Sequence, residues 1–212
     1  MSRKRPRHPA GTTLVLEYDS KILADNPLGD PHRRKLAVWL PPDYDSGTAR
    51  GRSSGRGKRF PVLFDLVGFT GSGLAHVNWR PFDENVPERL ARLVAERRIG
   101  PTIVVFPDCF TSMGGNQYVN SPAIGRYADY LTRELVPFVD REFRTLADRD
   151  HRGCFGKSSG GYGAIIHAMK YAKKPEIAGT IQTGALILAA LIEGVALFGV
   201  VVCLMIELKT YF

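Results

Sequence analysis

Short apolar runs alternate with longer segments of helical periodicity between residue 12 and about residue 172. Strands are predicted at 12–18, 35–40, 61–67, 102–107 and 152–155, and the runs at 61–67 and 102–107 are rich in Val, Ile, Leu and Phe. The runs at 61–67 and 102–107 are apolar at most positions, which is typical of strands buried on both faces of a sheet.

Two segments between these runs carry apolar side chains at helical spacing. The first is 84–98, with Val86, Leu90, Leu93 and Val94, and the second is 125–143, with Tyr127, Tyr130, Leu131, Leu135 and Phe138. Pro137 predicts a kink or a break in the second helix. Strands that alternate with helices predict an α/β fold, with a mostly parallel sheet and helices on both faces.

The pattern changes after residue 172. Residues 184–206 contain one charged side chain, Glu193, and several glycines and alanines. A bilayer is crossed by about 20 apolar residues, so this stretch is long enough to form a transmembrane helix that packs on other helices. The alternative is a helix buried in a protein core. We predict a membrane-anchoring helix here.

Charge is uneven along the chain. The chain has 29 Lys plus Arg against 21 Asp plus Glu, a net charge of +8, and residues 1–60 contain 13 basic and 6 acidic side chains. Residues 1–11 read as a disordered basic tail and residues 50–59 as a flexible Arg/Gly/Ser loop. No aromatic residues alternate with these charges, so we do not expect a nucleic acid partner. The amino terminus has no secretory signal pattern, which predicts a cytoplasmic hydrolase domain.

The cysteines and histidines indicate no metal site. Cys109, Cys154 and Cys203 are widely spaced and include no Cys-x-x-Cys pair, and the five histidines lack the spacing of metal ligands. We therefore expect no disulfide framework, no metal and no cofactor. With 44% hydrophobic and 24% charged residues, the composition excludes a chain that is disordered throughout.

The motif with the clearest chemistry is Gly156-Lys157-Ser158-Ser159-Gly160-Gly161, between a predicted strand and a predicted helix. A Gly-x-Ser-x-Gly sequence in that context is typical of a nucleophile elbow, which lifts the serine hydroxyl to the end of the sheet. Glycines are needed because flanking side chains would collide with the neighbouring backbone. The alternative is a glycine-rich turn with no catalytic role. We predict Ser158 as the nucleophile.

A second glycine-rich loop, residues 67–73, follows the strand at 61–67. An oxyanion hole requires two backbone N–H donors, one from the residue after the nucleophile and one from the loop after an earlier strand. Ser159 fits the first position, and Gly68 or Phe69 fits the second. The alternative is again a simple glycine-rich turn.

Residues 33–172 resemble an esterase family of α/β hydrolases that includes esterase D and enterochelin-esterase-like enzymes. The segments that carry the resemblance are residues 34–44, 60–64, 68–71, 78–82, 104–108 and 155–163. The resemblance implies hydrolysis of a small-molecule carboxylic ester through an acyl-enzyme at Ser158, with no cofactor.

The acid and base of the expected triad have no clear counterpart. In α/β hydrolases the order is Ser, then Asp or Glu, then His. After Ser158 the chain has Glu176, Glu193, Glu207 and one histidine, His167. His167 lies nine positions along the predicted helix, roughly 13 Å from Ser158, which is too far for a hydrogen bond. His76 is a remote substitute. We therefore predict a hydrolase fold that lacks its C-terminal part and is weakly active or inactive.

Residues 175–206 resemble the second transmembrane helix of the rotary ATP synthase c subunit, which implies that Glu193 binds a transported proton or ion. The sequence is thus divided into a tail (1–11), an esterase-like domain (12–172) and a c-subunit-like hydrophobic helix (173–212). A membrane ion-binding segment and a non-functional chimera are the two alternatives to the esterase function.

Overall fold

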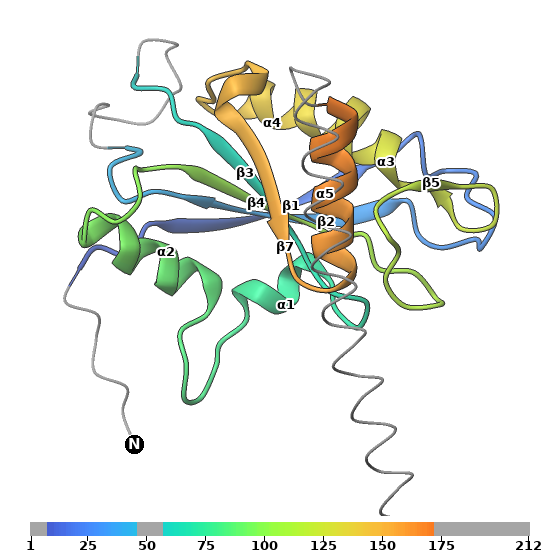
Figure 1. Cartoon of the computed structure of the whole chain (residues 1–212), viewed down its shortest axis with the longest axis horizontal. Helices are drawn as coiled ribbons and strands as arrows, with labels where there is room; N and C mark the ends of the chain where they lie inside the picture. The colour runs from blue at the N-terminus through green and yellow to red at the C-terminus, as the bar shows by residue number, and fades with distance from the viewer. Residues whose placement is uncertain (1–7, 46–56, 172–212) are drawn as a thin grey trace, which may run out of the picture. The chain divides into compact units, whose positions relative to one another are not determined.

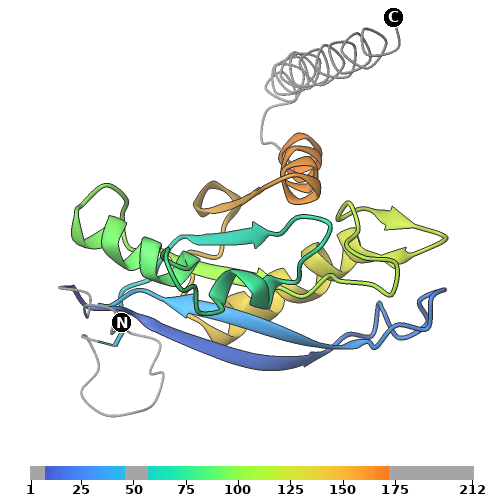
Figure 2. The ribbon, with the colours of Figure 1, turned by 90° about the horizontal axis from the view of Figure 1, so that it is seen from below.

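The computed structural model describes residues 8–45 and 57–171. The chain divides into two units, residues 1–164 and 165–212. The first unit contains a five-stranded sheet (Figures 1 and 2). Its strands, in the order in which they lie side by side, are β1 (Thr12–Asp19), β2 (Arg33–Leu40), β4 (Ile103–Pro107), β3 (Val62–Leu66) and β7 (Arg152–Gly156).

The sheet is mixed. β4 and β7 pair parallel with β3, whereas β2 pairs antiparallel with both β1 and β4. The prediction of a mostly parallel sheet therefore describes the half that carries the Gly-x-Ser-x-Gly motif, but not β1 and β2. For the β1–β2 pair the reason is local, because the segment between these strands contains no helix that could bring the chain back for a parallel pairing.

Side chains alternate between two cores, one on each face of the sheet. In β2, Leu36 and Val38 belong to one core, and Ala37 and Trp39 belong to the other. Helices α1 (Gly73–Val77) and α2 (Val86–Ala95) cover the Trp39 face, and α3 (Tyr127–Asp129) and α4 (Val136–Glu142) cover the opposite face (Figure 1). The prediction of helices on both faces is confirmed.

The remaining elements are short, apart from the helix that follows β7. They are the paired strands β5 (Asn120–Ser121) and β6 (Gly125–Arg126), the π-helical turn η1 (Tyr130–Leu135), the 3₁₀ turn η2 (Arg149–His151) and the helix α5 (Ser159–Tyr171). Residues 159–164 of α5 belong to the first unit and the later ones to the second.

The predicted helix at 125–143 is interrupted. It begins as strand β6 and contains the wider turn η1 immediately before α4. Pro137 has no backbone N–H, so the hydrogen bond that an α-helix would form at this point cannot be made. A π-helical turn at that place accommodates the missing bond. The break predicted at Pro137 is therefore present, and it lies on the N-terminal side of the proline.

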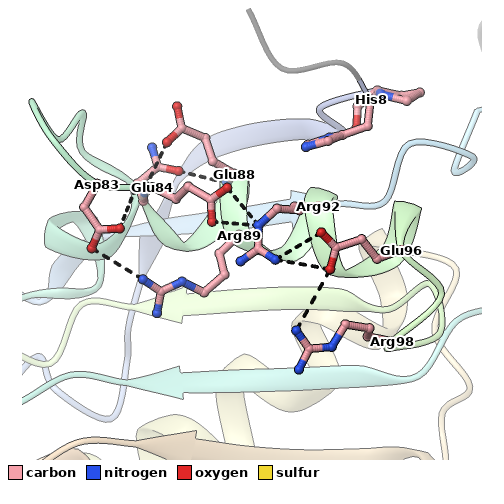
Figure 3. A network of polar contacts seen from close by, with 10 residues as sticks. His8, Asp83, Glu84, Glu88, Arg89, Arg92, Glu96 and Arg98 are labelled. Carbon is pink, nitrogen blue, oxygen red and sulfur yellow. Dashed lines mark hydrogen bonds and ion pairs between the residues drawn. The ribbon is translucent and has the colours of Figure 1, made fainter. Parts of the chain in front are cut away.

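Helix α2 is shorter than predicted from the pattern. The side chain of Asn85 accepts from the Glu88 N–H, and the Glu88 carboxylate accepts from the Asn85 N–H, which fixes the start of the helix. Arg97, with a φ of 57°, ends it. On its exposed face Arg92 bridges Glu84 and Glu96 (Figure 3). Because water and salt screen such surface pairs, they add little to the stability of the protein.

Several predicted features lie outside the described residues. They are residues 1–7 of the basic tail, most of the Arg/Gly/Ser loop, the hydrophobic stretch 184–206 and Glu193. Within the tail, Ala10 accepts a hydrogen bond from the Trp39 indole at 3.1 Å. Among the helices of residues 8–45 and 57–171, none is both long and apolar enough to cross a bilayer. The membrane helix and the ion-binding role of Glu193 stay predictions from the sequence.

Candidate active site

Ser158 occupies the turn between β7 and α5. Its φ is 56°, a left-handed conformation that is uncommon for a residue with a side chain. The Tyr162 N–H donates to the Ser158 carbonyl at 3.0 Å, and the Gly160 N–H donates to the Lys157 carbonyl at 3.0 Å. These two bonds hold a tight turn that leaves Ser158 exposed. The conformation is the one expected of a nucleophile elbow.

The glycines on either side of Ser158 lie against the end of β3. A Cβ atom at Gly156 or at Gly160 would overlap the carbonyl oxygen of Leu66. Only glycine therefore lets the turn approach the neighbouring strand so closely. This contact sets the elbow beside the first residues of the loop that follows β3.

The structure brings Gly68 next to Ser158. A Cβ atom on Gly68 would lie 3.7 Å from the Ser158 Cβ and 3.5 Å from the Lys157 carbonyl oxygen. Both residues follow the carboxyl ends of the adjacent parallel strands β3 and β7. The predicted oxyanion donor and the predicted nucleophile, which are separated by 90 positions in the sequence, therefore form one site.

The loop that carries Gly68 is fixed through its carbonyl groups. The carbonyls of Val67, Gly68 and Phe69 accept from the Tyr118 hydroxyl, the Gly71 N–H and the Gly115 N–H, respectively. Within the part of the chain that the structure describes, the N–H groups of Gly68 and Phe69 donate to no acceptor. Two backbone donors are thus held in place and free to bind an anion, as an oxyanion hole requires.

Ser159 begins helix α5. Its buried hydroxyl donates to the Asn116 carbonyl at 2.7 Å and lies 3.1 Å from the side-chain oxygen of Gln117. The backbone N–H groups at a helix start carry partial positive charge. The predicted role of Ser159, donation from its backbone N–H, is compatible with this placement, since its side chain is bound elsewhere.

Residues 109–118 form a third wall of the site, and they were not predicted from the sequence. Gly114 lies against the Phe69 ring and Gly115 donates to the Phe69 carbonyl, while Asn116 contacts Ser159. This segment links the loop after β3 to the start of α5. Its only signal in the sequence is the Gly114-Gly115 pair, which allows close approach of the backbone.

A buried acidic side chain in β3, close in sequence to the loop that carries Gly68, is paired with a histidine. Asp65, in β3, is 1% exposed, and its Oδ2 lies 2.6 Å from Nδ1 of His76 in α1. The other oxygen, Oδ1, is buried and has no hydrogen-bond partner among the described residues. A histidine whose Nδ1 is fixed by a carboxylate has the orientation that general bases use. His76 was expected only as a remote substitute for the base, and its pairing with Asp65 was not predicted.

The Ser158 hydroxyl makes no hydrogen bond within residues 8–45 and 57–171. His167 lies in α5, within the second unit of the chain. The described residues therefore provide a serine and free oxyanion donors, without a base in contact with the serine. In the same part of the chain, no three His, Cys, Asp or Glu side chains are grouped so that they could hold a metal ion.

Apolar side chains are exposed around the site. Phe69, next to Gly68, is 48% exposed, and Tyr162, one helical turn after Ser158, is 50% exposed. Met113, beside the glycine that contacts Phe69, is 65% exposed. Exposed apolar side chains gathered near a polar centre are typical of a surface that binds a ligand.

A family model described as "Putative esterase" matches residues 31–179. The chain belongs to this esterase family. The match extends past the domain boundary predicted at residue 172. Esterase MT1326 of Mycobacterium tuberculosis (strain CDC 1551 / Oshkosh) and Esterase Rv1288 of strain ATCC 25618 / H37Rv are 34% identical to the chain over 140 residues. The match covers 63% of this chain and 25% of each relative, so the chain spans about a quarter of their length.

Solved structures show the same fold. A ferulic acid esterase superposes with a TM-score of 0.59 at 23% identity, over 76% of this chain and 56% of that one. FphF, a fluorophosphonate-binding serine hydrolase of Staphylococcus aureus, superposes with a TM-score of 0.57 at 22% identity, over 77% and 54%. The esterase family and the α/β hydrolase fold expected from the sequence are confirmed.

Proposed function

We propose that this chain carries the nucleophile and the oxyanion hole of a serine carboxylic ester hydrolase. The observation that carries the proposal is the position of Gly68 beside Ser158, with the free N–H groups of Gly68 and Phe69 on the same loop. Membership in the esterase family supports it. The division into an esterase-like domain and a C-terminal hydrophobic helix belongs to the same proposal.

The reaction has two steps. The Ser158 oxygen attacks the ester carbonyl carbon, its proton passes to a base, and the carbonyl oxygen becomes an oxyanion that accepts from the backbone N–H groups of Gly68, Phe69 and Ser159. Collapse releases the alcohol, which takes up a proton, and leaves an acyl-enzyme. Water then attacks this ester, and the carboxylic acid departs as Ser158 regains its hydrogen.

Among the described residues, no base that could take the Ser158 proton contacts the serine. In serine proteases that have lost a member of the triad, the oxyanion hole and substrate binding still accelerate the reaction over water by roughly 10³-fold. We therefore expect slow acylation of Ser158. The exposed side chains of Phe69, Tyr162 and Met113 favour esters whose acyl or alcohol group is apolar.

The test uses a fluorophosphonate probe and p-nitrophenyl butyrate with the full chain. We expect slow covalent labelling at Ser158, read by mass spectrometry of the labelled peptide, and its complete loss in Ser158→Ala. Ser121→Ala, which alters a serine in strand β5, is the matched control and should label at the wild-type rate. Labelling that persists in Ser158→Ala would overturn the proposal.

A further inference from the structure

Tyr118 contacts the peptide group that carries one of the proposed oxyanion donors, the Gly68 N–H. Its hydroxyl donates to the Val67 carbonyl oxygen at 2.7 Å. The Val67 carbonyl and the Gly68 N–H belong to one planar peptide group, so their directions are fixed relative to each other. The hydrogen bond that fixes the direction of the Val67 carbonyl therefore also fixes the direction of the Gly68 N–H.

The hydroxyl of Tyr118 stays a donor under ordinary conditions. Tyr118 is 3% exposed, and burial raises the pKa of its phenol well above the usual value, with Cys109 and Asp65 adding to the effect. A protonated phenol that donates to a carbonyl draws electron density from the peptide group. The N–H at the other end of that group thereby becomes a stronger donor, as in other hydrogen-bonded chains.

The surroundings hold Tyr118 in an unfavourable backbone conformation. Its φ is 59°, in the left-handed region, where a bulky side chain is rarely found. Its N–H donates to the Asn116 side-chain oxygen at 2.7 Å, and its ring lies so close to Gly163 that a Cβ there would be 2.7 Å from the ring. Strained conformations that several contacts enforce cluster at functional sites.

We propose that Tyr118 is a positioning residue that orients and polarises the Gly68 N–H in the oxyanion hole. This inference rests on the proposed esterase function. The ring of Tyr118 contacts α5 at Gly163, and its hydroxyl contacts the end of β3 at Val67. One side chain therefore couples the nucleophile elbow to the loop that binds the oxyanion.

The test compares Tyr118→Phe with wild type. The variant keeps the ring and loses only the donor. We expect the fluorophosphonate labelling rate, and kcat for p-nitrophenyl butyrate, to fall about tenfold. Complete removal of an oxyanion donor lowers kcat by about 10²–10³-fold, and this substitution only weakens one donor. KM should change less than twofold. The Gly68 amide proton should shift upfield in the NMR spectrum of the variant, because its peptide group is then less polarised.

Tyr130→Phe is the matched control. Tyr130 is equally buried, and its hydroxyl has no hydrogen-bond partner among the described residues, so its removal should change neither rate nor the Gly68 shift. A second variant places 3-fluorotyrosine at position 118, which keeps the hydroxyl and makes it a stronger donor. In this protein the Gly68 amide proton should shift downfield, even if Tyr118→Phe does not fold.

The outcomes separate this inference from the proposed function. Wild-type rates and an unchanged Gly68 shift in Tyr118→Phe, together with an inactive Ser158→Ala, would overturn the role of Tyr118 alone. Labelling that survives in Ser158→Ala would overturn the esterase proposal, and the Gly68 shift would then decide the role of Tyr118. An unmoved shift in the fluorotyrosine protein would count against it in either case.

Discussion

The Oδ2 atom of Asp65 lies 2.6 Å from Nδ1 of His76, and this contact joins strand β3 to helix α1 across the loop that carries Gly68. Asp65 is almost fully buried on the face of the sheet that packs against α1 and α2, whereas the His76 side chain is 26% exposed. A buried carboxylate is costly unless it is paired. The pair therefore links the two ends of the loop that carries Gly68 and fixes the path of the chain between them.

Replacing His76 with Phe should destabilise the protein strongly, because it leaves the Asp65 carboxylate buried and unpaired. We expect a loss of about 3 kcal/mol in the free energy of unfolding, measured by urea denaturation. His76→Asn should lose less, since the amide of asparagine places a donor near the position of Nδ1. His151→Asn, at an exposed pair with Asp148, serves as control and should change little. Equal losses for both His76 variants would show that the hydrogen bond does not matter.

The elbow should not tolerate a side chain at Gly160. A methyl group there would overlap the Leu66 carbonyl, a backbone atom of β3 that cannot move aside without displacing the sheet. We expect Gly160→Ala to lower the free energy of unfolding by about 2 kcal/mol or more and to abolish fluorophosphonate labelling. Gly100→Ala, at a position with no atom within 4 Å of the added methyl, should behave like wild type in both measurements.

Stability should fall at low pH partly through Asp129. Burial alone would raise the pKa of this carboxyl, but hydrogen bonds from Arg126 and Asn120 and the charge of Arg133 outweigh it, so the pKa is lowered. A lowered pKa in the folded state means that stability is fully present above the ordinary carboxyl range and is lost as pH falls through the folded-state value. In Asp129→Asn, the free energy of unfolding should depend less on pH below the unperturbed pKa of about 4. Identical profiles of unfolding free energy against pH for wild type and Asp129→Asn would show that Asp129 does not contribute to the loss of stability at low pH.

The sequence predicted the elements that depend on local pattern. A strand was predicted at the position of each of the five strands of the main sheet, and the Gly-x-Ser-x-Gly motif located the turn at Ser158, because such patterns appear in neighbouring residues. The contacts that build the site are of a different kind. Tyr118 with Val67, and Asp65 with His76, join positions 51 and 11 residues apart, and no local pattern marks such pairs.

Two differences have direct physical causes. The short helix α1, which was not predicted, begins at Gly73, the last residue of the predicted glycine-rich loop, where a side chain would collide with the Phe106 carbonyl. The antiparallel pairing of β1 and β2 follows from a connection that contains no helix. Secondary-structure propensity could indicate neither feature, since both depend on the contacts that each segment makes in the folded chain.

The rate of Ser158 modification should rise with pH without a plateau near neutrality. A serine activated by a histidine reacts through the neutral imidazole, so its rate levels off above the histidine pKa, which is ordinarily about 6.5. The Ser158 hydroxyl has no such partner in the described residues, so only its own slight ionisation makes it reactive, and the rate should increase about tenfold per pH unit. The fluorophosphonate labelling rate is measured between pH 5.5 and 9, in steps of about half a pH unit, for wild type and for His76→Asn. A plateau that disappears in His76→Asn would identify the histidine paired with Asp65 as the base, and would contradict the expectation of a serine without one.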